Sequence, residues 1–200
     1  MEHNLGDLKN MADCIPVEMK KITDPDGTSR LGAVADLKEV LAIPDLKSRL
    51  MATEKRYQLL LENCRKISAE IKTKEGRSDA SLRWQIGDFA LNFLTSLQKT
   101  MGVCLVGHIN ALSRDLQISP RDLNYIVNFR RKYVNKEELD RRIDWSKYRE
   151  LLEVSNPSLR KDLEEMIKKG RITTREKLRE LKRSGSSFQE FKKKMVQKGR

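Results

Sequence analysis

The sequence predicts an all-α protein, in which a long coiled-coil-like N-terminal helix is followed by a helical domain that contains a helix-turn-helix. Three observations lead to this fold class. A heptad-like stripe begins at Asp45, two helical segments meet at a short polar turn between Leu112 and Tyr133, and further segments have apolar residues at spacings of three and four. The expected organisation is a loosely structured segment (1–44), a long heptad helix for association (45–75), a helix-turn-helix domain (80–183) and a basic tail (184–200).

The first 44 residues show little periodicity. Two prolines and the turn signal DPDGTS, at Asp24 to Ser29, interrupt any regular pattern. We therefore expect loose structure here, with a short helix from about Leu31 to Leu41.

The long helix carries a narrow apolar stripe. Asp45 can cap its start, and apolar or small residues then follow at alternating intervals of four and three over four heptads. Such a stripe needs a partner helix. We expect a homodimer, and the alternative is that the stripe packs on the protein's own helices. The residues expected to hold the dimer are Leu46, Leu50, Tyr57, Leu60, Ile67 and Ile71.

Positive charge is concentrated in the second part of the chain. The formal net charge is +12; Lys plus Arg against Asp plus Glu number 14 against 14 in residues 1–79, and 27 against 15 in residues 80–200. A neutral part joined to a basic part suggests that the basic part binds a polyanion while the other part does something else.

The cysteines and histidines do not suggest a metal site. Cys14, Cys64 and Cys104 form no CxxC pair, and the sequence contains only two histidines. We expect free thiols, no metal and no cofactor. With no signal peptide and no long apolar run, we expect a soluble cytoplasmic protein without a membrane partner, associated with the nucleoid if it binds DNA.

The stretch LSRDLQISPRDLNYIVNFRRKY predicts a helix-turn-helix. One helix is expected from about Cys104 to Leu116, and Ser119 followed by Pro120 is typical of an N-cap and first helical residue. So short a turn forces the helices to cross at a large angle. Gln117 stands where many such motifs have glycine. The residues expected to lock the helices together are Leu112, Leu116, Ile118, Leu123 and Ile126.

The second helix of this motif has a polar outer face. Arginine can bridge two acceptors on guanine and asparagine can bridge adenine, whereas flanking cations contact phosphates. The alternative is a merely solvated face. The candidate DNA-binding residues are Ser119, Arg121, Asn124, Tyr125, Asn128, Arg130, Arg131, Lys132, Arg141, Arg142 and Lys147.

Three more helices are expected after this motif. They run from about Trp145 to Val154, from Asn156-Pro157 to Gly170, and onward from a cap at Thr173 or Thr174. Together they predict a compact unit added to the helix-turn-helix.

Several motifs resemble a known family. They are WQIG at Trp84, LSRDL at Leu112, LNYIVNF at Leu123 and IDWSKYRELLEVSNP at Ile143. They look like the N-terminal helical domain of a family of uncharacterised bacterial proteins, in which that domain precedes a PD-(D/E)XK nuclease. The resemblance covers about half of the chain and implies a winged-helix-like or helix-turn-helix DNA-binding domain. Since about twenty residues follow Leu181, we expect the nuclease to be absent, and a separate nuclease is a possible partner.

The sequence favours a non-catalytic protein that binds duplex DNA as a dimer. The pair Pro25-Asp26 and Asp36-Leu37-Lys38 has the order of a nuclease site, but GAVADLKEVL reads as a helix and not as the strands that such a site needs. Two alternatives remain open. One is a structural adaptor that binds another protein through the long helix, and the other is an RNA-binding protein.

Overall fold

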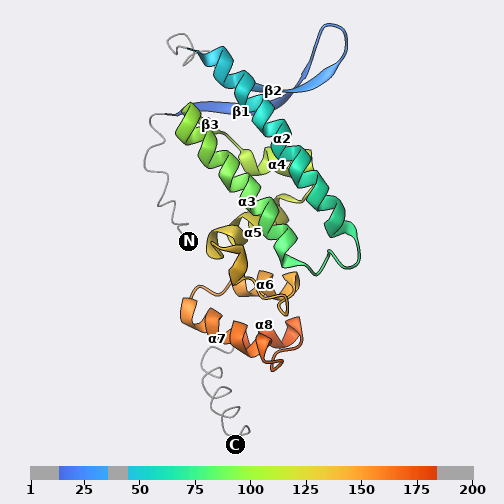
Figure 1. Ribbon diagram of the computed structural model, residues 1–200, viewed down its shortest axis with the longest axis vertical. Helices are drawn as coiled ribbons and strands as arrows, with labels where there is room; N and C mark the ends of the chain where they lie inside the picture. The colour runs from blue at the N-terminus through green and yellow to red at the C-terminus, as the bar shows by residue number, and fades with distance from the viewer. Residues whose placement is uncertain (1–13, 36–44, 184–200) are drawn as a thin grey trace, which may run out of the picture. The chain divides into compact units, whose positions relative to one another are not determined.

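The fold is mostly helical but includes a β-sheet, so the all-α prediction is wrong. The computed structural model describes residues 14–35 and 45–183 (Figure 1). A three-stranded mixed sheet has the strand order β2-β1-β3. The predicted basic tail at 184–200 lies outside the described residues.

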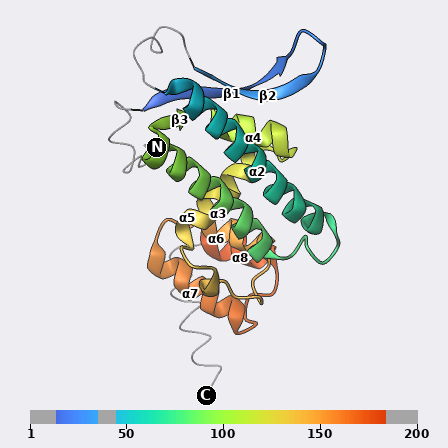
Figure 2. The same ribbon diagram turned by 45° about the horizontal axis from the view of Figure 1, so that its top comes forward.

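The N-terminal part forms a β-hairpin rather than loose structure. Strand β1 (Ile15–Thr23) pairs antiparallel with β2 (Ser29–Ala35), and Figure 2 shows the two strands side by side. Ile15, Val17 and Met19 are buried while the residues between them are more exposed, and this period of two is the pattern of a strand with one face in the core. The short helix expected from Leu31 is therefore wrong as far as Ala35, and its remainder lies outside the described residues.

The predicted turn at Asp24 to Ser29 connects the two strands. Gly27 has φ +83°, which glycine adopts without strain, and its N–H donates to the carbonyl of Asp24 at 2.9 Å. The Asp26 carboxylate accepts hydrogen bonds from the backbone and the hydroxyl of Thr28. These bonds lower the pKa of Asp26.

The third strand comes from a distant part of the sequence. β3 (Val103–Leu105) runs parallel to β1, and Val106 donates its N–H to the carbonyl of Val17 at 2.8 Å. This strand occupies the start of the helix expected from Cys104. Gly107, with φ +60°, separates the strand from the helix that follows.

The expected helices from Asp45 onward are present with adjusted ends. Asn156 accepts hydrogen bonds from the backbone of Ser158 and Leu159, and the hydroxyl of Thr174 accepts one from Lys177, as the predicted caps require. The helices are α2 (Leu46–Lys72), α3 (Ala80–Ser96), the π-helical turn η2 (Leu97–Met101), α4 (His108–Leu116), α5 (Pro120–Lys132), the 3₁₀ turn η3 (Lys136–Glu138), α6 (Trp145–Leu152), α7 (Pro157–Lys168) and α8 (Arg175–Arg183). Each helix within residues 14–35 and 45–183 is too short or too polar to span a bilayer.

The chain forms two compact units that interleave in sequence. Unit 1 consists of Met1–Ser68 and Gln85–Val127, and unit 2 of Ala69–Trp84 and Asn128–Arg200. Helices α2, α3 and α5 therefore each contribute residues to both units. The expected segments 45–75 and 80–183 are likewise each shared between them.

In unit 1, the apolar stripe of α2 packs against the chain itself. Tyr57, Leu60 and Ile67 are buried, and the ring of Tyr57 lies 5.7 Å from that of Phe93 in α3. This matches the intramolecular alternative. Leu46, Leu50 and Ile71 are half-buried.

Unit 2 is built around an aromatic cluster. Phe129 contacts the rings of Tyr133, Trp145 and Tyr148 at centroid distances of 5.0, 5.3 and 4.9 Å. The indole N–H of Trp84 donates to the carbonyl of Tyr133 at 2.7 Å, which satisfies its polar group inside the core.

Two of the three cysteines are joined, so the expectation of three free thiols is wrong. Cys14 and Cys104 form a disulfide beside the paired ends of β1 and β3. Their separation of 90 residues hid the pairing, because only the parallel strands bring them together. Cys64 is the free thiol, and burial raises its pKa to about 12.

We expect Cys14→Ser to lower the free energy of unfolding by up to about 4 kcal/mol, because the disulfide closes a long loop in the unfolded chain. Urea unfolding with and without dithiothreitol measures this loss, and the reductant should leave the variant unchanged. Three titratable thiols in the denatured, unreduced protein would contradict the disulfide.

Candidate nucleic-acid interface

The turn between α4 and α5 is closed by hydrogen bonds. Gln117 adopts a left-handed conformation, with φ +56°. The N–H of Ile118 donates to the carbonyl of Ser113 at 3.1 Å, and the Ser113 hydroxyl donates to the carbonyl of Ile118. These bonds satisfy the end of α4 and reverse the chain within three residues.

The start of α5 is capped as the sequence predicts. The hydroxyl of Ser119 accepts from the N–H of Asp122 at 3.1 Å and donates to the Asp122 carboxylate at 2.9 Å. Pro120 occupies the first helical position, where no N–H is needed. Ser119 therefore fixes the helix end, and Asp122 adds negative charge at the positive end of the helix dipole.

The residues predicted to join α4 and α5 are buried or half-buried. Leu112 and Leu116 of α4 and Leu123 and Ile126 of α5 are buried, and Ile118 in the turn is half-buried. Ser113 is buried at the same junction. The structure therefore has two helices joined by a turn of three residues where the sequence predicts a helix-turn-helix.

A carboxylate holds α4 to its neighbours in unit 1. Asp115 accepts hydrogen bonds from the hydroxyl of Tyr57 at 2.8 Å and from Arg114 at 2.7 Å. Arg114 also donates to the carbonyl of Met19 in β1, and Arg65 of α2 donates to the backbone carbonyl of Asp115. Burial alone would raise the pKa of Asp115, but the hydrogen bonds from Arg114 and Tyr57 outweigh burial and lower it.

The outer face of α5 presents polar side chains at intervals of three and four residues. Arg121, Asn124, Asn128 and Arg131 are exposed. Tyr125 is half-buried, and the guanidinium of Arg121 lies 5.9 Å from the centre of its ring. These positions share one side of a helix, as the sequence predicts.

Three other candidate residues have structural contacts in unit 2. Arg130 stacks over the ring of Trp84 at 4.6 Å, and the amine of Lys132 donates to the carbonyl of Leu152 at the end of α6. Burial lowers the pKa of Lys132. The side chain of Lys147 is only 12% exposed and pairs with Asp144. These cations help to hold the unit together.

Arg141 and Arg142 are exposed in the loop before α6. Arg142 binds both carboxylate oxygens of Asp140, at 2.9 and 2.6 Å, and donates to the carbonyl of Lys168. Hydrogen bonds from Arg142 hold the pKa of Asp140 at about 2.

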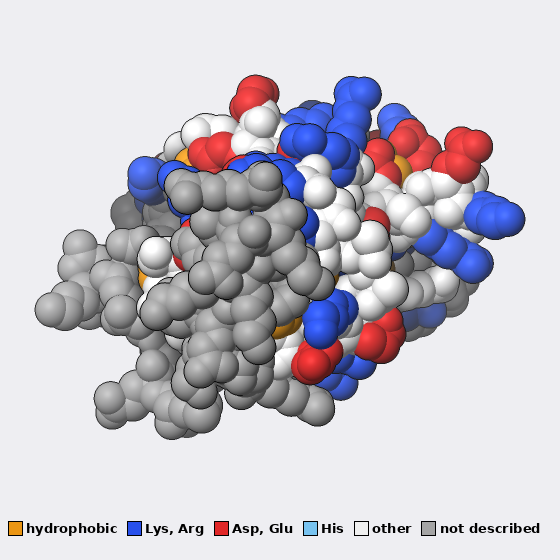
Figure 3. Space-filling model, turned by 90° about the horizontal axis from the view of Figure 1, so that it is seen from below, with side chains coloured by type: hydrophobic (Ala, Val, Ile, Leu, Met, Phe, Trp, Pro, Cys, Tyr) orange, Lys and Arg blue, Asp and Glu red, His pale blue; other side chains and the backbone are white. Residues whose placement is uncertain are grey.

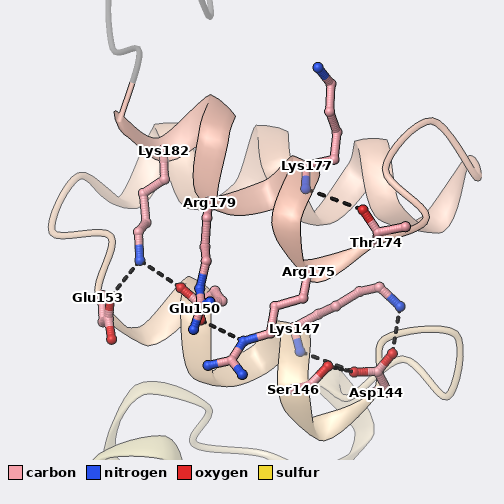
Figure 4. A network of polar contacts seen from close by, with 10 residues as sticks. All are labelled: Asp144, Ser146, Lys147, Glu150, Glu153, Thr174, Arg175, Lys177, Arg179 and Lys182. Atoms are coloured by element: carbon pink, nitrogen blue, oxygen red, sulfur yellow. Dashed lines mark hydrogen bonds and ion pairs between the residues drawn. The ribbon is translucent and has the colours of Figure 1, made fainter.

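The sequence did not reveal a network of charges between α6 and α8. The buried carboxylate of Glu150 accepts from Arg175, Arg179 and Lys182 at 2.7, 2.8 and 2.9 Å (Figure 4). Figure 4 shows these three side chains pointing from α8 towards Glu150, whereas Lys177 points away. Their spacing of four and three residues was the available signal, but no feature of the sequence identified Glu150 as their partner.

Basic side chains are numerous but not segregated on the face drawn in Figure 3, where Lys and Arg lie among Asp and Glu. Among the described residues, no three His, Cys, Asp or Glu side chains come together as metal ligands would. Asp26 of the nuclease-like pair lies in the β-hairpin turn, and Asp36 to Lys38 lie outside the described residues.

Comparison with known proteins gives no relative. No family model matches the chain, and neither a curated protein nor a solved structure matches it.

We expect Gln117→Gly to stabilise the protein by about 0.5–1 kcal/mol, because glycine adopts the left-handed conformation without steric cost. Thermal unfolding measures the gain. Gly107→Ala is the reverse control, since Gly107 has φ +60° and open space around it, and it should destabilise by about 1 kcal/mol. An unchanged or lower melting temperature for Gln117→Gly would show that the turn carries no such strain.

Glu150 should make stability depend on acid pH. Burial tends to raise its pKa, but hydrogen bonds from Lys182, Arg175 and Arg179 outweigh this and bring the pKa to about 2. Its stabilisation, about 3 kcal/mol, is complete above the unfolded pKa near 4.5 and is lost as the pH falls towards 2. Between pH 6 and about pH 2, the free energy of unfolding measured in urea should fall less for Glu150→Gln than for the wild type. An equal change in both proteins would contradict this role.

Proposed function

We propose that the protein binds duplex DNA without catalysing a reaction, and that α5 enters the major groove. The observation that carries this proposal is the pair of helices α4 and α5, with a hydrogen-bonded turn of three residues between them, buried apolar side chains on both and exposed polar side chains on the second helix. In proteins of this class the first turns of the second helix contact base edges, and the first helix crosses the backbone.

The first turns of α5 have the chemistry for this task. Arg121 can donate two hydrogen bonds to the O6 and N7 atoms of guanine, and Asn124 can pair with the N6 and N7 atoms of adenine. Both side chains are exposed.

The alternatives have less support from the described residues. Single-stranded RNA is commonly bound by stacking on exposed aromatic rings, but every aromatic side chain described is buried or half-buried. An adaptor that uses the apolar stripe of α2 would compete with the chain's own packing, because Tyr57, Leu60 and Ile67 are buried.

Binding by the full chain tests the class of ligand. Fluorescence anisotropy with duplex DNA, single-stranded DNA and RNA, at several salt concentrations, should show duplex preferred and an affinity that falls steeply with salt. Preference for RNA would replace the proposal by the RNA alternative, and no binding to any nucleic acid would overturn it.

Two variants test whether α5 reads bases. On a duplex selected from a random pool, Arg121→Ala and Asn124→Ala should each weaken binding by about 5- to 150-fold, which corresponds to about 1–3 kcal/mol for each bidentate pair of hydrogen bonds removed. Binding to unrelated duplexes should change much less for Asn124→Ala, because asparagine carries no charge.

Asn110→Ala is the matched control, since Asn110 is an exposed asparagine on α4. It should leave the affinity for the selected duplex unchanged. If Arg121 and Asn124 tolerate alanine as Asn110 does, α5 does not read the sequence.

A further inference from the structure

Several cations, four of them exposed and one half-buried, lie around the C-terminal end of α7 in unit 2. The chain reverses there at Gly170, with φ +68°, and Arg171 donates its N–H to the carbonyl of Met166 at 2.9 Å. The loop before α6 contacts the C-terminal end of α7, where Arg142 donates a hydrogen bond to the carbonyl of Lys168 at 3.3 Å. We call this cluster the α7-end patch, and it consists of Arg141, Arg142, Lys168, Lys169 and Arg171.

The patch has more positive charge than its neighbouring carboxylates neutralise. Asp140 pairs with Arg142, and Glu165 pairs with Lys168. Arg141, Lys169 and Arg171 are exposed, and no carboxylate lies within ion-pair distance of them among the described residues. The side chain of Arg142 is itself 65% exposed. The patch therefore keeps an excess of positive charge at the surface.

The cations of α8 contrast with this patch. Arg175, Arg179 and Lys182 converge on Glu150, and Lys182 also pairs with Glu153 (Figure 4). Much of their positive charge is already neutralised by the buried carboxylate of Glu150, so they attract a phosphate less strongly than unpaired cations, and drawing them away would leave that carboxylate without its partners. Although α8 is rich in cations, it is the poorer phosphate-binding surface.

We propose that the α7-end patch binds the phosphate backbone of duplex DNA, and that it supplies affinity without reading sequence. The inference deepens the proposed function and depends on it. Exposed Lys and Arg side chains release condensed counterions when they contact phosphates, and this release gives binding its salt dependence. Phosphate contacts of this kind also fix the position of a protein on the duplex.

A purely structural role for the same cations gives a different expectation. Positive charge at a helix C-terminus stabilises the helix through its dipole. If that were the whole role of the patch, removing the cations would lower the melting temperature and leave DNA binding unchanged. Stability and binding therefore have to be measured on the same variants.

The test uses the full chain with Arg141→Ala and Arg171→Ala combined. Both side chains are exposed, so the double variant should fold. On duplexes of unrelated sequence, the slope of log K against log salt should fall by about 2, or about 1 for each phosphate that the variant no longer neutralises. All duplexes should be weakened alike, in contrast to the variants of α5.

The control removes the same charge from another exposed surface. Lys55→Ala combined with Lys66→Ala changes two exposed lysines of α2 and should leave the slope nearly unchanged. If the wild type binds duplex DNA but both double variants bind equally well, the patch inference is wrong and the proposed function stands. If the wild type shows no binding, the proposed function itself fails.

Discussion

The carboxylate of Asp115 is the contact on which the arrangement of unit 1 depends. It joins the hydroxyl of Tyr57 in α2 to α4, and through Arg114 it reaches the backbone of β1 at Met19. A half-buried charge with fewer partners would be costly, so the three elements have to meet at this point. These contacts hold α4 against the sheet and against α2, and they do not involve the exposed side chains of α5.

Charge has two distinct uses in unit 2. Around Glu150 the cations are paired with a buried carboxylate, and their contribution is to fix α8 against α6. Around the end of α7 the cations exceed their carboxylates and remain at the surface. The sequence shows only that the second part of the chain is basic. The structure adds which of these cations are paired with the buried Glu150 and which lie at the surface around the end of α7.

Local patterns predicted the helices that follow Asp45, apart from their ends, because periodicity and caps are encoded within each segment. Ser119, Asn156 and Thr174 mark helix starts that the structure retains. The sheet was missed because its buried alternation, from Ile15 to Met19, covers few residues, and because β3 comes from a distant segment. The disulfide was missed for the same reason. The outer face of α5 was predicted because helical spacing alone determines it, whereas the partner of Lys132, the carbonyl of Leu152, lies 20 residues away in the sequence and could not be read from local spacing.

The packing of the apolar stripe of α2 decides whether that stripe is free to form a dimer. One helix-turn-helix covers half a site, and such proteins commonly gain affinity by pairing. Here Tyr57, Leu60 and Ile67 are buried in their own chain, so a dimer built on them would have to displace existing packing. Phosphate contacts at the proposed α7-end patch would add affinity without a second chain, so the proposed function does not depend on a dimer built on the α2 stripe.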